Sequence, residues 1–267
     1  MVKQDAAAHT TRRIFVIDIE STGVSVTEVR NRLDPSQHRL SSLPSSLTAD
    51  EPSTMALWAQ FTKEFAEKVL AAEVDIAEAI FIFGCSSDPF AAAGGNFAFS
   101  LRVVEYLAKI GPRLFCVQTR SPLVLLALPV LSSPACRTAV VFYLESRSDK
   151  VNAAISAYLP RPSERLQAIR ALKRSHVHTI LHVAAPQGER ALGTFALILS
   201  ELGLPVVFAG EQTAEQSGSK KPRHREQAVL QRYYNRAHGP WVTHSLQEIL
   251  LNAADSTPAR LLQKEAA

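Results

Sequence analysis

Polar side chains follow short apolar runs in the middle of the chain, and these side chains are its main candidates for chemistry. The run at residues 79–84 is followed by Ser87 and Asp88, and the run at residues 114–117 is followed by Arg120. A hydroxyl, a carboxylate and a guanidinium offer hydrogen bonds and charge to a polar ligand. In folds built on parallel strands, such residues lie where the strands end, which is where chemistry sits.

The elements that would position these residues alternate along the chain. Short apolar runs, expected as strands, lie at 79–84, 114–117, 138–144 and 178–185, and helix-like segments lie at 99–107 and 161–173. Further patterns predict a strand at 12–20, a strand at 205–209, and helices over 57–70, over 194–202 and from 245 onward. We expect Ser163 to be the N-cap of the helix at 161–173. The alternation predicts repeated β-α units around a parallel sheet, hence an α/β fold.

Length and composition favour one globular domain with extensions. The chain has 267 residues, 46% of them hydrophobic, and a net charge of +4. This mild basicity permits a polyanionic partner but does not argue for one. No apolar run approaches the length of a membrane span, and the first residues carry no apolar signal core. We therefore expect a cytoplasmic protein without a membrane partner.

Three cysteines, Cys85, Cys116 and Cys136, are odd in number and widely spaced. This pattern favours buried, reduced thiols over a disulfide framework. His178 and His182 fall four residues apart on an expected strand and so share a face. With no further partner near in sequence, we interpret them as ordinary histidines and predict no metal site.

Asp18 and Glu20 lie two residues apart on the first expected strand, which puts both carboxylates on one face. The segment 12–23 resembles the first motif of DEDD-type exonucleases, in which such a pair reaches a catalytic metal. That activity needs carboxylates from later motifs, and the segment 95–100 lacks the expected Asp. We therefore interpret this segment as a plain strand with polar edge residues and keep a metal-dependent nuclease as an alternative.

Four further segments resemble the radical S-adenosylmethionine family, within it the spore-photoproduct-lyase-like branch. Residues 84–90 resemble its strand end of small residues before Asp-Pro-Tyr, and residues 117–124 resemble its Thr-Lys-Ser strand end. Residues 159–172 resemble its Pro-Ser-x-x-Arg-Leu-x-Ala-Ile helix, and residues 182–186 its Val-Ala-Pro strand end. Their order and spacing over about a hundred residues make the match specific. The resemblance implies a partial (β/α)6 TIM-like barrel with parallel strands.

The chain departs from this family at the iron-sulfur motif. The family holds a [4Fe-4S] cluster on Cys-x-x-x-Cys-x-x-Cys, and the counterpart positions here are Arg39, Leu43 and Ser46. None of these side chains is a thiolate, which such a cluster needs as ligand. We therefore expect no cluster and no radical chemistry, and interpret the chain as a degenerate family member, a pseudoenzyme with at most a binding role. An active lyase-type enzyme with an unusual or partner-supplied cluster is the alternative.

The resemblance also assigns candidate cofactor-binding residues. Ser87 and Asp88 match strand-end residues that approach the cofactor, and Arg120 matches a strand-end Lys. The strand-end Ser of the third run is replaced by Tyr143. This leaves S-adenosylmethionine open as a ligand, while catalytic residues stay unassigned.

Three regions follow from these patterns. Residues 1–54 form an N-terminal strand and a Ser/Pro-rich loop region, residues 55–210 the radical-SAM-like partial barrel, and residues 211–267 a basic linker and a C-terminal helical extension. Lys220, Lys221, Arg223 and Arg225 make the linker basic, with aromatic residues Tyr233, Tyr234 and Trp241 beyond them. A nucleic-acid partner bound there, or a protein partner, stays open beside the simpler interpretation of a solvated connector.

Overall fold

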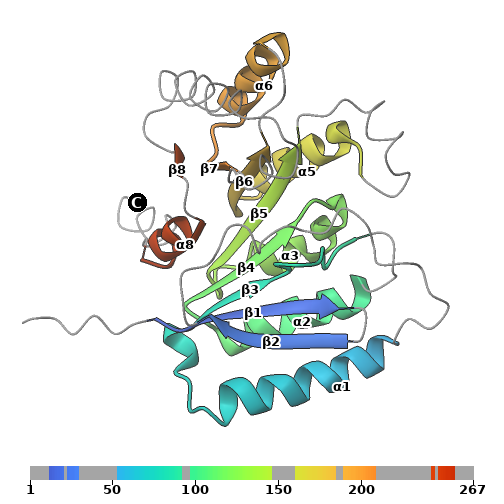
Figure 1. Ribbon diagram of the computed structural model, residues 1–267, viewed down its shortest axis with the longest axis vertical. Coiled ribbons are helices and arrows are strands. Elements are labelled where there is room, and N and C mark those ends of the chain that lie inside the picture. Colours follow the sequence, from blue (N-terminus) through green and yellow to red (C-terminus); the bar gives the residue numbers. More distant parts are fainter. Residues whose placement is uncertain are drawn as a thin grey trace, which may run out of the picture.

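The protein is built on one eight-stranded, mainly parallel sheet (Figure 1). The computed structural model describes residues 12–20, 23–29, 53–91, 97–145, 160–184, 189–208, 242–243 and 246–255. The strands are β1 (Ile14–Glu20), β2 (Gly23–Val29), β3 (Ile80–Phe83), β4 (Leu114–Thr119), β5 (Thr138–Glu145), β6 (His178–Ala184), β7 (Val206–Phe208) and β8 (Val242–Thr243). Their spatial order is β2-β1-β3-β4-β5-β6-β7-β8. Only the β1–β2 pair is antiparallel.

Helices connect the parallel strands. They are α1 (Thr54–Phe65) with the π-helical turn η1 (Ala66–Leu70), the short 3-10 turns η2 (Ile76–Glu78) and η3 (Pro122–Ala127), α2 (Phe97–Ile110), α3 (Leu128–Leu131), α5 (Pro162–Arg174), α6 (Glu189–Leu202) and α8 (Leu246–Asp255). From β3 to β8 each strand lies beside the one before it in the chain. Because such crossovers are right-handed, a strand order without reversal places the connecting helices on one face of the sheet.

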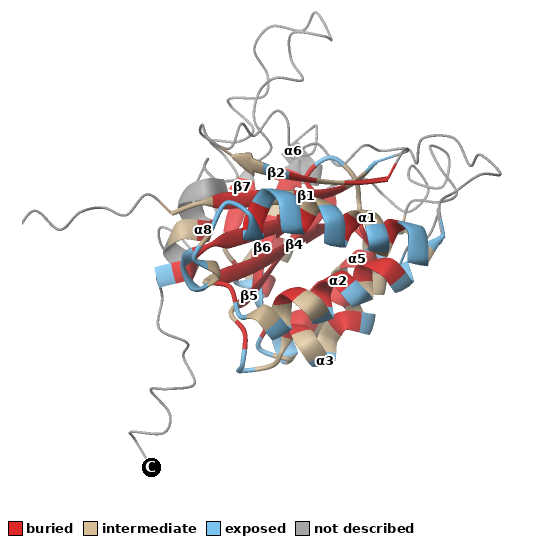
Figure 2. Ribbon diagram, turned by 90° about the horizontal axis from the view of Figure 1, so that it is seen from below, coloured by how far each residue is buried: buried red, intermediate tan, exposed pale blue. Residues whose placement is uncertain are grey.

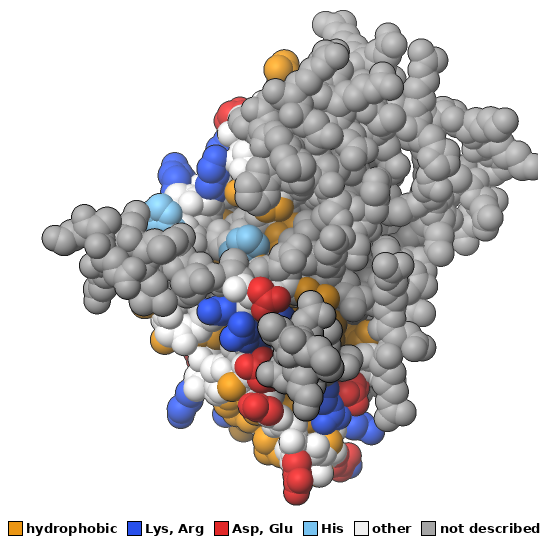
Figure 3. Space-filling view, turned by 90° about the vertical axis from the view of Figure 1, so that its left-hand side faces the viewer, with side chains coloured by type: hydrophobic (Ala, Val, Ile, Leu, Met, Phe, Trp, Pro, Cys, Tyr) orange, Lys and Arg blue, Asp and Glu red, His pale blue; other side chains and the backbone are white. Residues whose placement is uncertain are grey.

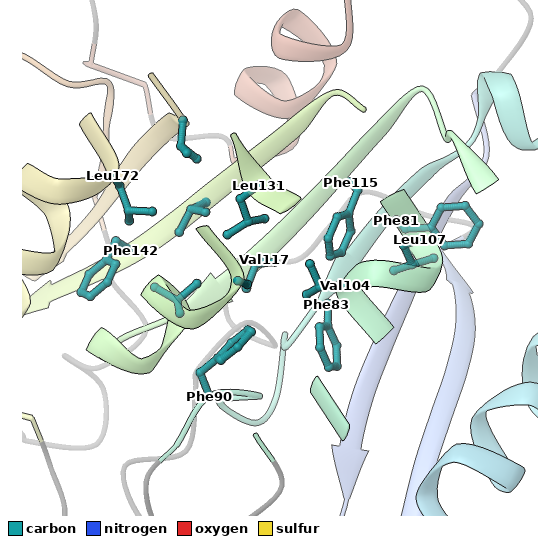
Figure 4. Packing of buried hydrophobic residues seen from close by; sticks show 14 of the residues in the cluster. Phe81, Phe83, Phe90, Val104, Leu107, Phe115, Val117, Leu131, Phe142 and Leu172 are labelled. Carbon is teal, nitrogen blue, oxygen red and sulfur yellow. The ribbon is translucent and has the colours of Figure 1, made fainter. Parts of the chain in front are cut away.

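The two faces of the sheet carry separate apolar clusters. The helical face, as we call it, packs α1, α2, α5 and α6 on side chains that include Phe81, Phe115 and Phe142. Figure 4 shows Phe83, Val104, Leu107 and Leu172 in this layer, and Figure 2 shows exposed residues along the outward side of α1. The opposite face, the α8 face, gathers Ile14, Ile80, Leu114, Cys116, Ala139, Val141 and Ile180 with Leu250 and Ala254 of α8. Alternate residues of a strand point to opposite faces of the sheet. A strand that is buried on both faces therefore has apolar residues at successive positions, which explains the continuous apolar runs in the sequence.

The predicted α/β class with parallel strands is confirmed, with differences in detail. The antiparallel strand β2 was not predicted. Strands β1 and β2 come from the segment assigned to the N-terminal region, yet they belong to the same sheet as β3. The described strands form a sheet with edges at β2 and β8, so closure toward a (β/α)6 barrel stays a prediction. Within the described ranges, no helix is long and apolar enough to cross a membrane.

The N-terminus of α5 corrects one local prediction. Arg161, not Ser163, is the N-cap, and its backbone N–H donates to the Glu164 carboxylate at 2.8 Å. Pro162 follows at the first helical position, where its fixed φ suits the helix and its missing N–H costs nothing. Arg165, in the same first turn, is fully buried.

Candidate ligand-binding edge of the sheet

The turn after β3 is shaped by a glycine and held by a buried carboxylate. Gly84 has φ +90°, and a Cβ there would lie 2.8 Å from the Gln118 carbonyl oxygen, so a larger residue would collide with backbone. The next two amides, of Cys85 and Ser86, donate to Asp18 Oδ1 at 2.6 and 2.9 Å. Asp18 thereby ties the end of β1 to the loop that follows β3.

Asp88 ties the same loop to the end of β4. Its Oδ1 accepts hydrogen bonds from the Thr119 hydroxyl at 2.6 Å and from the Phe90 backbone N–H at 3.0 Å. Its Oδ2 accepts from the Arg120 backbone N–H at 2.9 Å. Burial raises the pKa of Asp88 above its ordinary value, although these hydrogen bonds oppose the shift. Three donors from two elements converge on one carboxylate, which fixes the position of this strand end.

A chain of polar contacts crosses the α8 face at the carboxyl ends of β4, β5 and β6. The Tyr143 hydroxyl donates to Gln118 Oε1 at 2.7 Å, and Gln118 Nε2 donates to Cys85 Sγ at 3.3 Å. Burial raises the pKa of Tyr143, so its hydroxyl keeps its proton and acts as donor. The rings of Tyr143 and His182, neighbours across β5 and β6, have centroids 4.4 Å apart. Gln118 and Tyr143 are 0% and 7% exposed, so the amide and the phenol form a buried polar layer at this edge, and the half-buried His182 ring lies against it.

The three cysteines do not fit a [4Fe-4S] cluster. Cys85 and Cys116 belong to the cluster on the α8 face, whereas Cys136 belongs to the cluster on the helical face. The sheet lies between them, and the sequence contains only these three cysteines. Burial raises the pKa of all three thiols, to about 12 for Cys116 and about 11 for Cys136. Such a cluster is held by several convergent thiolates, and these three thiols do not converge in the structure; the absence of a cluster stays a prediction.

The expected burial of the cysteines is confirmed, since all three are buried and free. Asp18 and Glu20 lie on one face of β1, as predicted, but Asp18 accepts from the backbone amides of the loop after β3. The exposed Glu20 accepts a hydrogen bond from the Ser25 hydroxyl at 2.8 Å on the adjacent β2. Among the residues that the structure describes, no three potential metal ligands come together, so this part supplies no further carboxylate for a nuclease site beside Asp18 and Glu20. His178 is exposed, and His182 is half-buried against Tyr143.

The candidate residues Ser87, Asp88 and Arg120 lie close together, where β3 and β4 end. The Ser87 hydroxyl accepts from the Ile19 backbone N–H at 3.2 Å, which joins this loop to β1. The Arg120 side chain is 6% exposed. The contacts of Ser87 and Asp88 are thus made with the protein's own backbone and with Thr119. Contact of these three residues with a ligand stays a prediction.

Gln118 is a polar residue of this edge that the sequence analysis did not select as a candidate. It shares the parity of Leu114 and Cys116 along β4, so strand alternation places it on the α8 face. The sequence did contain a signal for it, because Gln118 is a polar residue in line with the apolar residues Leu114 and Cys116. By contrast, several predictions fall outside the described residues: the counterpart of the cluster motif at 39–46, the first two residues of the segment 95–100, and the basic linker with Lys220, Lys221, Arg223 and Arg225.

Comparisons with known proteins give little at the level of sequence. No family model matches the chain, and no curated protein matches it. Among solved structures, SuiB of Streptococcus suis bound to S-adenosylmethionine is similar, with a TM-score of 0.42 and 13% identity. A second structure of SuiB is similar with the same TM-score and 11% identity. Each match covers 62% of this chain and 38% of the SuiB chain. A TM-score this low carries no argument about function, so the proposal below rests on the chain's own residues.

Proposed function

We propose that this chain is related to the radical S-adenosylmethionine superfamily and binds a nucleoside-type ligand without assembling a [4Fe-4S] cluster on its own cysteines. The order of the four family-like segments and the parallel α/β sheet support the relationship. One observation carries the second part of the proposal: Cys136 packs on the face of the sheet opposite to Cys85 and Cys116.

The carboxyl ends of β4, β5 and β6 on the α8 face supply the proposed binding residues. The half-buried His182 ring, which packs against the buried Tyr143 ring, provides an aromatic face on which a purine can stack. The Gln118 amide is oriented by the Tyr143 hydroxyl and by the Cys85 sulfur. Ser87 and Asp88 hold the adjoining loop in place, and the Arg120 guanidinium supplies positive charge at the same edge. S-adenosylmethionine, S-adenosylhomocysteine and adenosine share the purine and the ribose that this edge would bind.

Isothermal titration calorimetry with these three compounds tests the proposal. We expect wild-type protein to bind at least one of them and His182→Ala to weaken binding about 5- to 150-fold, since stacking of a base on an aromatic side chain is worth about 1–3 kcal/mol. His178→Ala is the matched control, because His178 lies on the same strand but at its starting end and is exposed. Absence of binding by the wild type at about millimolar concentrations, a Kd range worth only about 4 kcal/mol, would contradict the proposal. Equal losses in the two variants would contradict the placement of the site.

A further inference from the structure

The α8 helix lies across the starting ends of the strands, away from the proposed ligand edge. In Figure 1 it lies to the left of the sheet, whereas β1 points to the right. Leu250 and Ala254 are 1% and 0% exposed, and they pack among Ile14, Ile80 and Leu114 on the α8 face. Each of these three strand residues lies at the first position of its strand. The helix therefore covers the amino-terminal end of that face.

Three arginines hold the last turn of α8. Arg12 lies two residues before the start of β1, and its Nη2 lies 2.5 Å from Asp255 Oδ1. Arg113 directly precedes β4, and its Nη2 lies 3.5 Å from the same oxygen. Arg137 directly precedes β5, and its Nη1 donates to the Ala254 carbonyl oxygen at 2.5 Å. Guanidinium groups at the end of a helix satisfy its last carbonyls and complement the negative end of its dipole.

These contacts differ from the rest of the packing around α8 because water reaches them. The Asp255 side chain is 55% exposed, and those of Arg12 and Arg113 are 23% and 29% exposed. From the side on which α8 lies in Figure 1, basic and acidic side chains lie next to one another (Figure 3). The Arg12 hydrogen bond lowers the pKa of Asp255, so the carboxylate is charged at neutral pH. Exposed charge pairs of this kind are weakened by salt, whereas buried apolar contacts are not.

We infer that α8 is a detachable plug on the α8 face, closed by an arginine latch of Arg12, Arg113 and Arg137 on Asp255 and Ala254. Leu250 and Ala254 supply the buried contacts among the side chains of α8 that the structure describes, and the latch joins its last turn to the residues that precede β1, β4 and β5. When the latch opens, α8 leaves the face as a local unit while the sheet stays folded. Its release uncovers the starting ends of β1, β3 and β4. The inference concerns the starting ends of the strands and holds whether or not a nucleoside binds at the other edge.

Hydrogen exchange of the full chain, followed by mass spectrometry, tests this latch. We expect amides of residues 246–255 in wild-type protein to exchange several-fold faster at about 1 M than at about 0.01 M NaCl, between which the Debye length falls from about 30 Å to about 3 Å. Asp255→Asn should speed exchange of α8 at low salt and remove most of its salt dependence. Glu201→Gln is the matched control, because it removes another exposed ion pair, Arg170–Glu201 at 2.8 Å between α5 and α6.

Peptides from β4 (Leu114–Thr119) separate local release from general unfolding. The inference requires that β4 remain protected in Asp255→Asn while α8 does not. It is wrong if α8 exchanges equally in Asp255→Asn and wild type, or if salt has no effect on wild-type α8. Faster exchange of β4 and α8 together would also overturn it, because α8 would then not be a separate unit.

Discussion

Replacing Asp88 by Ala should be among the most destabilising single changes at the ligand edge. The carboxylate accepts from the Thr119 hydroxyl and from the backbone N–H groups of Phe90 and Arg120, at 2.6, 3.0 and 2.9 Å. Asp88→Ala leaves these three donors without this acceptor. A buried donor without a partner costs about 1–3 kcal/mol, and Asp88 is only half-buried, so the lower end applies to each. Relief of the carboxylate's own desolvation offsets part of this cost, and we expect a loss of about 2–3 kcal/mol in the free energy of unfolding.

Asp88→Asn separates the role of charge from that of geometry. The amide keeps one acceptor oxygen, but its NH2 group would face the Arg120 N–H, so we expect a loss of about 1–2 kcal/mol. Burial raises the pKa of Asp88, so the folded protein holds this proton more tightly than the unfolded chain. The advantage of wild type over Asp88→Asn should therefore be fully present below the ordinary aspartate pKa and decrease as pH rises through the raised pKa.

Urea denaturation followed by circular dichroism measures these differences. Asp75→Ala is the matched control, because Asp75 is exposed and accepts one hydrogen bond, from the Ala77 N–H at 3.0 Å. That variant should lose no more than about 1 kcal/mol. If Asp88→Ala costs no more than Asp75→Ala, then Asp88 does not tie the loop to β4 and the account of this strand end is wrong.

Two further outcomes follow from the buried polar groups on the sheet. Tyr143→Phe should lower the free energy of unfolding by about 1–2 kcal/mol, because Gln118 Oε1 loses a buried donor at 2.7 Å, and an unchanged urea midpoint would contradict that bond. The thiols should be inert in the folded state: with pKa values of about 12 for Cys116 and about 11 for Cys136, well under 1% of each is thiolate at pH 8. An aromatic disulfide reagent should label all three cysteines only when urea unfolds the chain, and a thiol that reacts at once in the native protein would show that its burial is misassigned.

Much of the sheet could be predicted because its strands are buried on both faces. The runs at 80–83, 114–119 and 138–145 are almost continuously apolar, and amphipathic segments separate them, which is the signature of parallel β-α units. The antiparallel strand β2 carries no such signature. Its residues Ser25, Thr27 and Glu28 are polar, because an edge strand is only half covered.

The details of the site depended on tertiary structure. Strand parity was enough to place Gln118 with Cys116, but no pattern shows that Asp18 accepts from the amides of Cys85 and Ser86 in the loop after β3. The sequence likewise marked Asp88 as a cofactor residue by resemblance, while its described contacts are with Thr119 and with backbone N–H groups. The position of Arg161 at the start of α5 could have been predicted, because Pro prefers the first helical position over an interior one.

Iron and acid-labile sulfide, measured after anaerobic reconstitution, test the central claim most directly. The account predicts far less than one [4Fe-4S] cluster per chain, and the same background in a variant with Cys85, Cys116 and Cys136 all changed to Ser, because the sheet separates Cys136 from the other two thiols. Near-stoichiometric iron and sulfide in the wild type, lost in that variant, would contradict it and show that these cysteines converge on a cluster.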